Sequence, residues 1–232
     1  MAKLSVIIPV YNEEATIAAV LEKVNAVAVD KEIIVVDDNS SDGTERILKD
    51  LKLSNLQVIR NQVNQGKGAS LVRGLALAKG DFAVIQDADL EYDPQDYLKL
   101  LDAQNQTKAD LVLGARFING YKGLLTHRLA NVFLTAMSNF LFRKNINDCM
   151  TCYKLFRPQR VRDFNLKSRG FDIEIEIFAK AVINKLNITE VPISYYPRSY
   201  SGGKKIKWQD GVWAVISIIR HKIYQIKNGK VS

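Results

Sequence analysis

Apolar runs alternate with amphipathic stretches along the first half of the chain. The segment Leu4–Val10 is nearly all apolar, as expected for a parallel strand that is buried on both faces. Helical spacing of apolar residues follows at Ile17, Val20, Leu21 and Val24. The same succession predicts strands at Glu32–Asp37, Leu56–Arg60, Asp81–Gln86 and Asp110–Gly114, and helices around Ile47–Leu51, at Lys67–Ala78 and at Tyr97–Gln104. This order predicts an α/β fold with a doubly wound, mostly parallel sheet flanked by helices.

The second half of the chain is less regular. Its pattern predicts helices at Leu129–Phe142 and Ile173–Leu186, and a strand at Ile188–Ile193 that contains Pro192. Asp210–Ile226 is predicted as a closing amphipathic helix with basic residues among its apolar positions. A length of 232 residues fits a single domain, so we expect residues 1–232 to fold as one unit.

The charge is concentrated near the end of the chain. The formal net charge is +8, and the stretch from Arg198 onward carries +7 of it, because eight Lys and Arg face the single Asp210. Nucleic acid, anionic lipid and a phosphorylated ligand each fit such a tail. Two cysteines cannot staple a chain of this length, and no apolar run approaches the roughly 20 residues of a membrane span. We therefore expect a cytoplasmic protein that does not itself cross a membrane.

Polar residues follow four of the predicted strands. In an open parallel sheet, ligands bind beyond the carboxyl ends of the strands, so these residues are expected to share one site. They are Pro9–Glu14, Asp37–Ser40, Asp87–Glu91 and Ala115–Phe117.

Asp87, Asp89 and Glu91 are the sharpest feature of this set. Alternate residues of an extended segment point the same way, and three crowded carboxylates repel one another unless a cation compensates them. Mg²⁺ or Mn²⁺ is the expected partner, completed by water and phosphate oxygens. The alternative is an acidic loop that caps the following helix through Asp93 and Pro94.

Two glycine motifs of nucleotide-binding proteins are missing. The first strand lacks the dinucleotide-binding glycine pattern, and Asn64–Ala69 lacks the spacing of a P-loop, so a dehydrogenase and a P-loop NTPase are both disfavoured. Gly66 and Gly68 either let backbone amides approach a ligand or simply form a tight turn.

Three motifs occur in the order of one enzyme family: Val6–Glu13, Val36–Thr44 and Gln86–Glu91. Together they resemble family 2 glycosyltransferases of the GT-A fold, in the branch of the dolichyl-phosphate mannose synthases. The resemblance extends through Tyr196–Arg198 to Lys204 and so covers nearly the whole chain. It implies an inverting transfer of a sugar from a nucleoside diphosphate donor, with residues 1–115 as the donor half, 116–205 as the acceptor half and 206–232 as a basic C-terminal helix.

The resemblance also implies roles for individual residues. The nucleoside is assigned to Pro9, Tyr11, Glu13, Val36 and Asp38, and the metal and diphosphate to Asp87, Ala88 and Asp89. Glu91 stands where mannose synthases often have Gln, and it remains a third metal-ligand candidate. The resemblance assigns the reaction itself to Asp87, Asp89, Arg116, Arg198 and Lys204, of which the three basic residues lie near the donor and acceptor phosphates.

The chemistry of the acceptor favours a polyprenyl phosphate. A sugar hydroxyl needs a positioned base, whereas a lipid phosphate is already an anion and needs cations to hold it. The sequence offers no unique base, only Asp148, Asp172 and Glu174, each of which also fits a cap or a solvated side chain. A sugar or glycan hydroxyl remains the alternative acceptor. A non-catalytic nucleotide-sugar binder and a nucleic-acid-binding module rank lower, the latter because an acidic rim opposes a polyanion.

The apolar helix at Leu129–Phe142 and the basic C-terminal helix suit a protein that rests on an anionic membrane surface, either by itself or through an anchoring partner. Core packing is the alternative explanation for the first of these helices. We expect peripheral association at the cytoplasmic membrane face.

Overall fold

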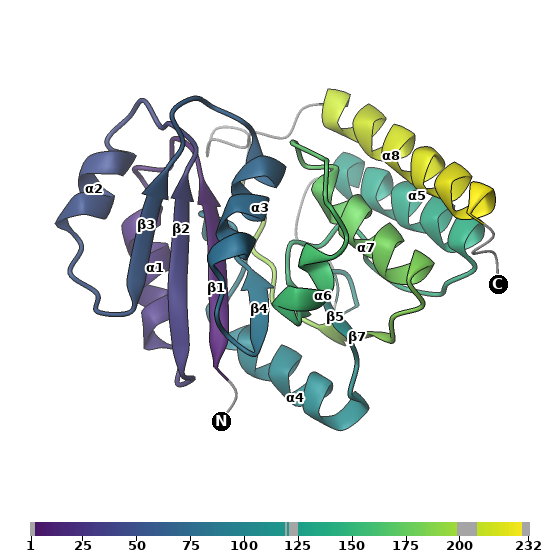
Figure 1. Cartoon of the computed structure of the whole chain (residues 1–232), viewed down its shortest axis with the longest axis horizontal. Helices are drawn as coiled ribbons and strands as arrows, with labels where there is room; N and C mark the ends of the chain where they lie inside the picture. Colours follow the sequence, from purple (N-terminus) through teal and green to yellow (C-terminus); the bar gives the residue numbers. More distant parts are fainter. Residues whose placement is uncertain (1–2, 119, 121–124, 199–207, 229–232) are drawn as a thin grey trace.

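The computed structural model describes residues 3–118, 120, 125–198 and 208–228, and only the backbone of 125–127 and 208. Seven strands form one sheet in the order β3-β2-β1-β4-β6-β5-β7 (Figure 1). All neighbours are parallel except β6, which runs antiparallel to both β4 and β5. The strands are β1 (Leu4–Val10), β2 (Lys31–Asp37), β3 (Leu56–Arg60), β4 (Phe82–Ile85), β5 (Leu111–Ala115), β6 (Lys154–Phe156) and β7 (Ile188–Pro192).

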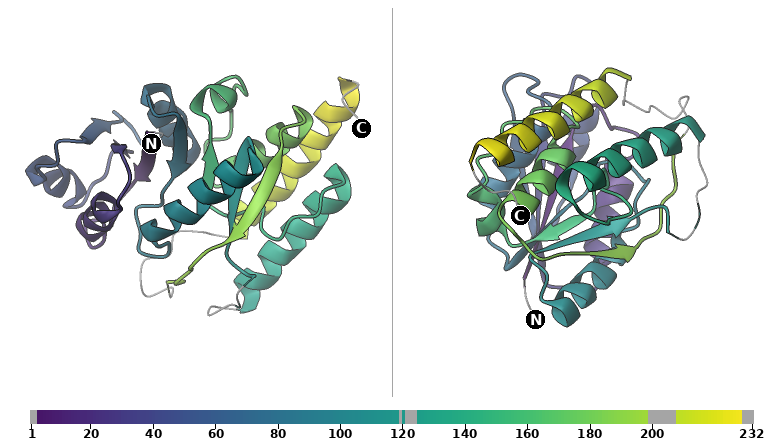
Figure 2. Two further views of the ribbon diagram at one scale, coloured as in Figure 1. Left: turned by 90° about the horizontal axis from the view of Figure 1, so that it is seen from below. Right: turned by 90° about the vertical axis from the view of Figure 1, so that its right-hand side faces the viewer.

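Helices cover both faces of this sheet. Figure 1 shows α3 in front of the sheet beside β1 and α1 behind β2 and β3. The right view of Figure 2 shows α4 on the opposite side of the sheet from α7 and α8. The helices are α1 (Ile17–Ala26), α2 (Thr44–Asp50), α3 (Lys67–Leu77), α4 (Tyr97–Thr107), α5 (Leu125–Phe142), α6 (Pro158–Arg162), α7 (Ile173–Ile183) and α8 (Trp208–Lys227), with a 3-10 turn η1 (Pro94–Asp96) before α4. The predicted doubly wound, mostly parallel sheet is confirmed.

The sequence prediction was incomplete between β5 and α7. It missed β6 and α6, which have three and five residues. The capping prediction for the acidic loop is correct, because the Asp93 carboxylate accepts a hydrogen bond from the amide of Gln95, with Pro94 in the first helical position. Both sheet halves meet at β6, so a segment that the pattern did not reveal joins the two parts of the fold.

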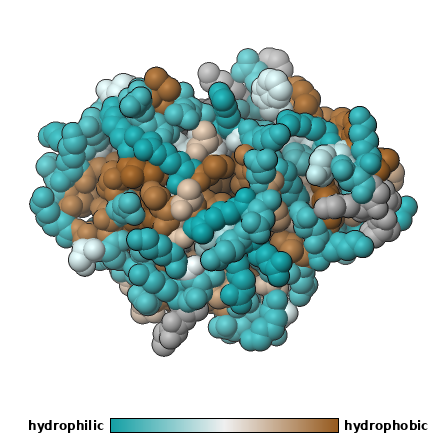
Figure 3. All heavy atoms as spheres, viewed as in Figure 1, coloured by the Kyte–Doolittle hydropathy of each residue, from teal (hydrophilic) through white to brown (hydrophobic). Residues whose placement is uncertain are grey.

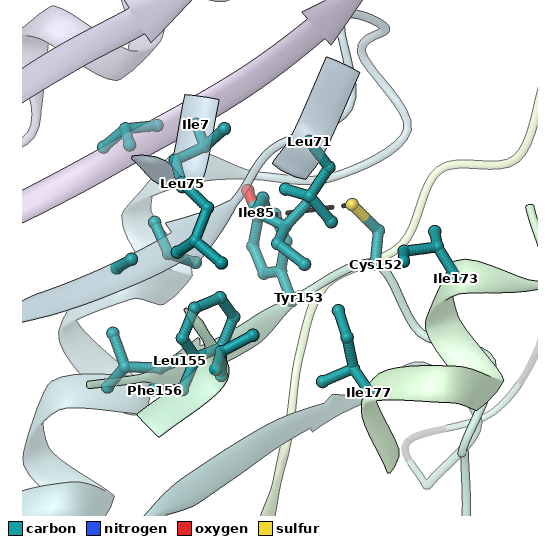
Figure 4. Close-up of a cluster of buried hydrophobic side chains, with 14 of the residues drawn as sticks. Ile7, Leu71, Leu75, Ile85, Cys152, Tyr153, Leu155, Phe156, Ile173 and Ile177 are labelled. Atoms are coloured by element: carbon teal, nitrogen blue, oxygen red, sulfur yellow. Dashed lines mark hydrogen bonds between the residues drawn. The ribbon is translucent and has the colours of Figure 1, made fainter. Parts of the chain in front are cut away.

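The core under the sheet is continuous across β6. Figure 4 shows Leu155 and Phe156 of β6 in one cluster of buried hydrophobic side chains with Leu75 of α3 and Ile177 of α7, and all four are almost fully buried. The neighbouring Cys152 directs its thiol toward the backbone oxygen of Ile85 at the end of β4, 3.7 Å away. Packing from both sides thus fixes the segment that leads into β6 against the edge of the sheet where the polar residues gather.

Helices α5, α7 and α8 form a layer beyond the sheet, with α5 beside α8 (Figures 1 and 2). Glu176 of α7 joins two of them, because its carboxylate accepts from the Lys180 ammonium at 2.7 Å and lies 3.7 Å from the His221 ring of α8. Burial alone would raise the pKa of Glu176, but the hydrogen bonds from His221, Lys180 and two backbone amides outweigh it and lower the pKa well below its usual value. In the described part of the chain, no helix has both the length and the apolar character to cross a bilayer.

Candidate active site

A cavity of about 1240 Å³ opens at the carboxyl edge of the parallel strands. Its wall comes from the ends of β1, β2, β4 and β5, the start of α3, and the facing parts of α5, α7 and α8. Ten of the predicted site residues line it: Pro9, Tyr11, Glu13, Asp38, Asp87, Ala88, Asp89, Glu91, Arg116 and Arg198. The prediction that the strand-end residues gather in one place is therefore confirmed.

Two predicted site residues are not part of this wall. The side chain of Val36 is fully buried in the middle of the sheet and is not among the residues that line the cavity. Lys204 lies outside the described residues.

The β2 end of the cavity is organised around Asp38. Its carboxylate accepts hydrogen bonds from the Asn61 amide group at 2.6 Å and from the backbone amides of Gln65 and Gly66 at 2.9 and 2.7 Å. Gly66 has φ +92°, and a Cβ there would lie 2.3 Å from the backbone oxygen of Arg169. The amide of Gly68 donates to that same oxygen at 2.7 Å. These glycine amides are used within the protein, which agrees with the tight-turn interpretation of the motif.

The acidic cluster, which we define as Glu13, Asp89 and Glu91, lies beyond the ends of β1 and β4. The Arg198 guanidinium lies among them, 2.9 Å from Asp89 Oδ2 and 3.1 Å from Glu13 Oε2, and its backbone amide donates to Glu91 Oε1 at 2.8 Å. Burial raises the pKa of Asp89 to about 7, and repulsion from Asp87 and Glu91 acts in the same direction, against the attraction of Arg198. The cluster therefore holds more negative charge than its arginine neutralises.

Asp87 faces a different cation, Lys67 at the start of α3. The Lys67 ammonium lies 2.6 Å from Asp87 Oδ1 and 3.1 Å from Glu174 Oε1. Burial would raise the pKa of Asp87, but the charge of Lys67 outweighs it and the pKa lies below its usual value. Burial would likewise lower the pKa of Lys67, and the carboxylates of Asp87 and Glu174 instead raise it well above normal. Both groups are thus ionised at the wall of the cavity.

A second lysine, Lys154, contacts the same Glu174 on the side away from the cavity. Lys154 of β6 is fully buried, and its ammonium lies 2.7 Å from Glu174 Oε2 and also donates to the backbone oxygen of Thr151. Glu174 therefore bridges two lysines. Sequence reasoning gave Lys67 and Lys154 no role. The sequence did contain one indication, namely that Lys154 stands inside the apolar stretch Cys152–Phe156. A lysine in such a stretch is expected to be buried, and a buried lysine requires an anionic partner.

Arg116 follows β5 and faces the cavity from the other side. Its guanidinium forms a two-point ion pair with Asp148, with Nε–Oδ2 and Nη2–Oδ1 distances of 2.6 and 2.8 Å. It also lies 5.2 Å from the centre of the Tyr195 ring. Such a planar pair fixes the direction in which the guanidinium points.

None of the three predicted base candidates is an uncommitted carboxylate in the cavity. Asp148 is fully buried against Arg116, and Glu174 is held between Lys67 and Lys154. Asp172 occupies the N-cap position of α7 and does not line the cavity. Asp148 and Glu174 orient cations, and the structure gives none of the three candidates the surroundings of a general base.

The acidic residues at the cavity have the donor chemistry of a divalent-metal site. As they stand, the described side chains form no group of three or more His, Cys, Asp or Glu that could hold a metal ion. The donor chemistry nevertheless fits, because Asp89 and Glu91 place hard oxygen ligands at the cavity together with surplus negative charge. Ions of the Mg²⁺ type commonly take only one or two carboxylates and complete their shell with water and substrate phosphates.

The cavity continues from these charges to α5 and α8. Asn131 and Leu134 of α5 and Gln209 and Gly211 of α8 line its far end. Further along, both helices expose large apolar side chains, and Figure 3 shows apolar atoms at the upper right, over these helices. The most exposed are Leu129, Val132, Phe133 and Phe140 of α5, and Trp213, Ile223, Tyr224 and Ile226 of α8.

Sequence comparison relates the chain to enzymes of sugar transfer. The sequence model described as glycosyl transferase family 2 matches residues 5–163. The polyprenol monophosphomannose synthase of Mycolicibacterium smegmatis is 29% identical over 86% of this chain and 79% of its own length. The dolichol-phosphate mannosyltransferase of Pyrococcus furiosus is 30% identical over 97% of this chain. That match spans 63% of the Pyrococcus protein, so the chain covers less than two thirds of it.

Solved structures share the fold. Glucosyl-3-phosphoglycerate synthase of Mycobacterium tuberculosis superposes with a TM-score of 0.72 at 21% identity, covering 95% of this chain and 80% of that one. Staphylococcus aureus TarS in complex with UDP-GlcNAc gives a TM-score of 0.64 at 20% identity, covering 94% of this chain and 66% of that one. Another crystal structure of the M. tuberculosis enzyme holds Mn²⁺ and UDP. The predicted GT-A fold is confirmed.

Proposed function

Because the chain belongs to glycosyl transferase family 2, we propose that it moves a hexose from a nucleoside diphosphate sugar to a polyprenyl phosphate, with inversion at the anomeric carbon. One observation carries the choice of acceptor. Arg116 and Arg198 both line the cavity, Arg198 within the acidic cluster. Of the base candidates, Asp148 and Glu174 are paired with cations and Asp172 does not line the cavity. A cavity whose described residues supply cations but none of the predicted bases suits an acceptor that is already an anion.

The reaction is a single displacement. An oxygen of the acceptor phosphate forms a bond to the anomeric carbon, and the bond from that carbon to the donor diphosphate breaks, so the nucleoside diphosphate leaves with the electron pair. No proton has to be removed from a lipid phosphate near neutral pH. Arg116, oriented by Asp148, would hold the acceptor phosphate, and the ammonium of Lys67 would face the leaving diphosphate. A divalent ion on Asp89 and Glu91 would add Lewis-acid stabilisation of that leaving group.

The donor would occupy the part of the cavity near β1 and β2. Tyr11 and Asp38 line it where the nucleoside is expected, with Asp87 and Ala88 further along the sheet edge. The solved neighbours that carry UDP or UDP-GlcNAc support a nucleotide sugar as donor. This arrangement keeps the proposed division into a donor half, residues 1–115, and an acceptor half, residues 116–205.

A transfer assay tests this proposal. Radiolabelled GDP-mannose, UDP-glucose and UDP-GlcNAc are each incubated with the protein, farnesyl phosphate and Mg²⁺ or Mn²⁺, and the label is then extracted into organic solvent. We expect one donor to label the organic phase, with no label when farnesol replaces farnesyl phosphate. Label that appears only in water-soluble products, when sugar acceptors are supplied, would contradict the lipid acceptor and favour transfer to a hydroxyl.

We also propose that α5 and α8 rest on the cytoplasmic face of a membrane, where the acceptor resides. Their exposed apolar side chains and the basic residues of α8 suit the surface of an anionic bilayer. Phe133→Asp and Trp213→Asp should each weaken co-sedimentation with vesicles that contain phosphatidylglycerol by several-fold. Val63→Asp is the matched control, because Val63 is 60% exposed but lies between β3 and α3. Equal binding by all variants would refute the membrane orientation.

A further inference from the structure

The Arg198 guanidinium occupies the centre of the acidic cluster rather than a position on its rim. It forms a two-point pair with Glu13, with Nη1–Oε2 and Nη2–Oε1 distances of 3.1 and 3.2 Å. The same Nη2 donates to Asp89 Oδ2 at 2.9 Å. Arg198 thus joins the residue that follows β1 to the residues that follow β4.

The carboxylate oxygens of this cluster are already in use. Asp89 Oδ1 accepts from the Glu91 amide at 3.0 Å, and Asp89 Oδ2 accepts from Arg198. Glu91 Oε1 accepts from the Arg198 amide at 2.8 Å, and Glu91 Oε2 accepts from the Tyr195 hydroxyl at 2.7 Å. A divalent ion needs direct access to these oxygens, because its ligand distances are about 2.0–2.2 Å. The guanidinium and the ion would place two positive charges at Asp89 Oδ2, so they compete for this oxygen.

We propose that a divalent cation binds Asp89 only in exchange for Arg198, and that this exchange releases the guanidinium toward the phosphates in the cavity. The inference rests on the proposed metal role of Asp89 and extends it to the order of binding. Three carboxylates surround one guanidinium, so a divalent ion is favoured over the single charge that it replaces. Glu13 keeps its own contacts with Arg198 and holds the released side chain close to the site.

The exchange couples two binding events. While Arg198 donates to Asp89, its Nη2 is directed at a carboxylate rather than at a phosphate. Once the ion takes that oxygen, the same group can donate to a phosphate, so metal binding would prepare the site for its anionic substrate. Metal would then bind before the acceptor, and Arg198 would slow acceptor capture whenever metal is absent.

Direct binding of Mn²⁺ alone tests the exchange, measured from the electron paramagnetic resonance signal of free Mn²⁺ without nucleotide. Arg198→Ala should bind Mn²⁺ about ten-fold more tightly than the parent protein, because a charge-assisted hydrogen bond no longer competes. Arg198→Lys keeps the charge but cannot contact Glu13 and Asp89 with a planar fork, and it should also bind more tightly, by about three-fold. Arg116→Gln removes a nearby charge without touching the cluster and should change the affinity less than two-fold.

Asp89→Asn serves as the second control and should abolish tight Mn²⁺ binding. If Arg198→Lys matches the parent protein, or if Arg198→Ala gains no more than Arg116→Gln, the effect is only through-space charge and the exchange is refuted. Failure of every variant to bind Mn²⁺ would overturn both the exchange and the metal role of Asp89. Label transfer to farnesyl phosphate is measured independently of Mn²⁺ binding, so the transfer assay tests the proposed acceptor separately. Circular dichroism confirms that each variant is folded.

Discussion

Asp89→Asn should lower the rate of sugar transfer about a thousand-fold, the largest effect we expect from any single substitution. Asp89 lies where β4 delivers its side chain to the cavity, beside Glu91 and Arg198. Removing its charge removes the electrostatic stabilisation of the departing diphosphate, which is worth about 10²–10³ in rate for one preorganised group and more when a metal is lost with it. Turnover measured by organic extraction at saturating donor checks this expectation.

The same substitution should leave the fold at least as stable. The pKa of Asp89 is raised to about 7, whereas an aspartate in the unfolded chain titrates near 3.9. The folded protein therefore binds a proton more tightly than the unfolded chain, so the parent loses stability as the pH rises through about 4 to 7. Asp89→Asn lacks this penalty, and in EDTA at pH 8 its free energy of unfolding should exceed that of the parent by about 1–3 kcal/mol.

Urea denaturation at pH 8 and pH 5 checks this linkage. The advantage of Asp89→Asn should shrink at pH 5, because Asp89 is then largely protonated in the folded parent. Asp50→Asn is the matched control, since Asp50 is an exposed residue at the end of α2. A variant that keeps near-parental turnover, or one that is less stable than the parent at pH 8, would contradict the role assigned to Asp89.

Lys154→Met should lower the free energy of unfolding by about 3–5 kcal/mol, the largest stability effect we expect. Its ammonium is fully buried 2.7 Å from Glu174, and removing one partner of a buried ion pair leaves the other charge uncompensated. Lys67 still contacts Glu174 and limits the loss. The urea midpoint at constant m-value measures the effect.

A double-mutant cycle separates the ion pair from packing. Lys154→Met combined with Glu174→Gln should be less destabilised than the sum of the single variants, by at least about 1 kcal/mol. Lys49→Met is the matched control, because Lys49 lies 2.6 Å from Glu45 but its side chain is 72% exposed, and exposed pairs contribute about 0–1 kcal/mol. Equal losses for Lys154→Met and Lys49→Met would show that the buried pair does not stabilise the fold.

The strands and helices of the first half were predictable because the apolar pattern of the sequence reveals which of their residues are buried. β1 and β4 are buried along their whole length and read as continuous apolar runs, and the helices between the strands carry apolar stripes. The segments β6 and α6 show no such pattern in the sequence. β6 has three residues with a lysine at its first position, and α6 has five, which is too short for periodicity to be read. Both are set by tertiary contacts.

The residues of the site likewise divide into those that local sequence predicts and those that only tertiary contacts bring together. Asp87, Asp89 and Arg116 were predictable because each lies shortly after the end of a strand, and the carboxyl ends of parallel strands meet at one edge of the sheet. Lys67 and Glu174 meet only because α3 and α7 pack on the same face of the sheet, far apart in sequence. No local pattern encodes such a contact. The commitment of Asp148 to Arg116 is of the same kind, so its role as a positioning residue emerged only from the structure.

The place of β6 constrains how the chain can acquire this architecture. Among the described strands, β5 pairs with β6 and β7 alone, and these two follow residue 115 by about 40 and 75 residues. During synthesis, β1 to β4 can pair as soon as they emerge, while β5 waits as an unpaired strand. Pairings of such long sequence separation are slow to form and leave exposed edges prone to aggregation. The Lys154–Phe156 segment joins β5 to β4, and the sheet is complete only when residues 188–192 add β7 on the other side of β5.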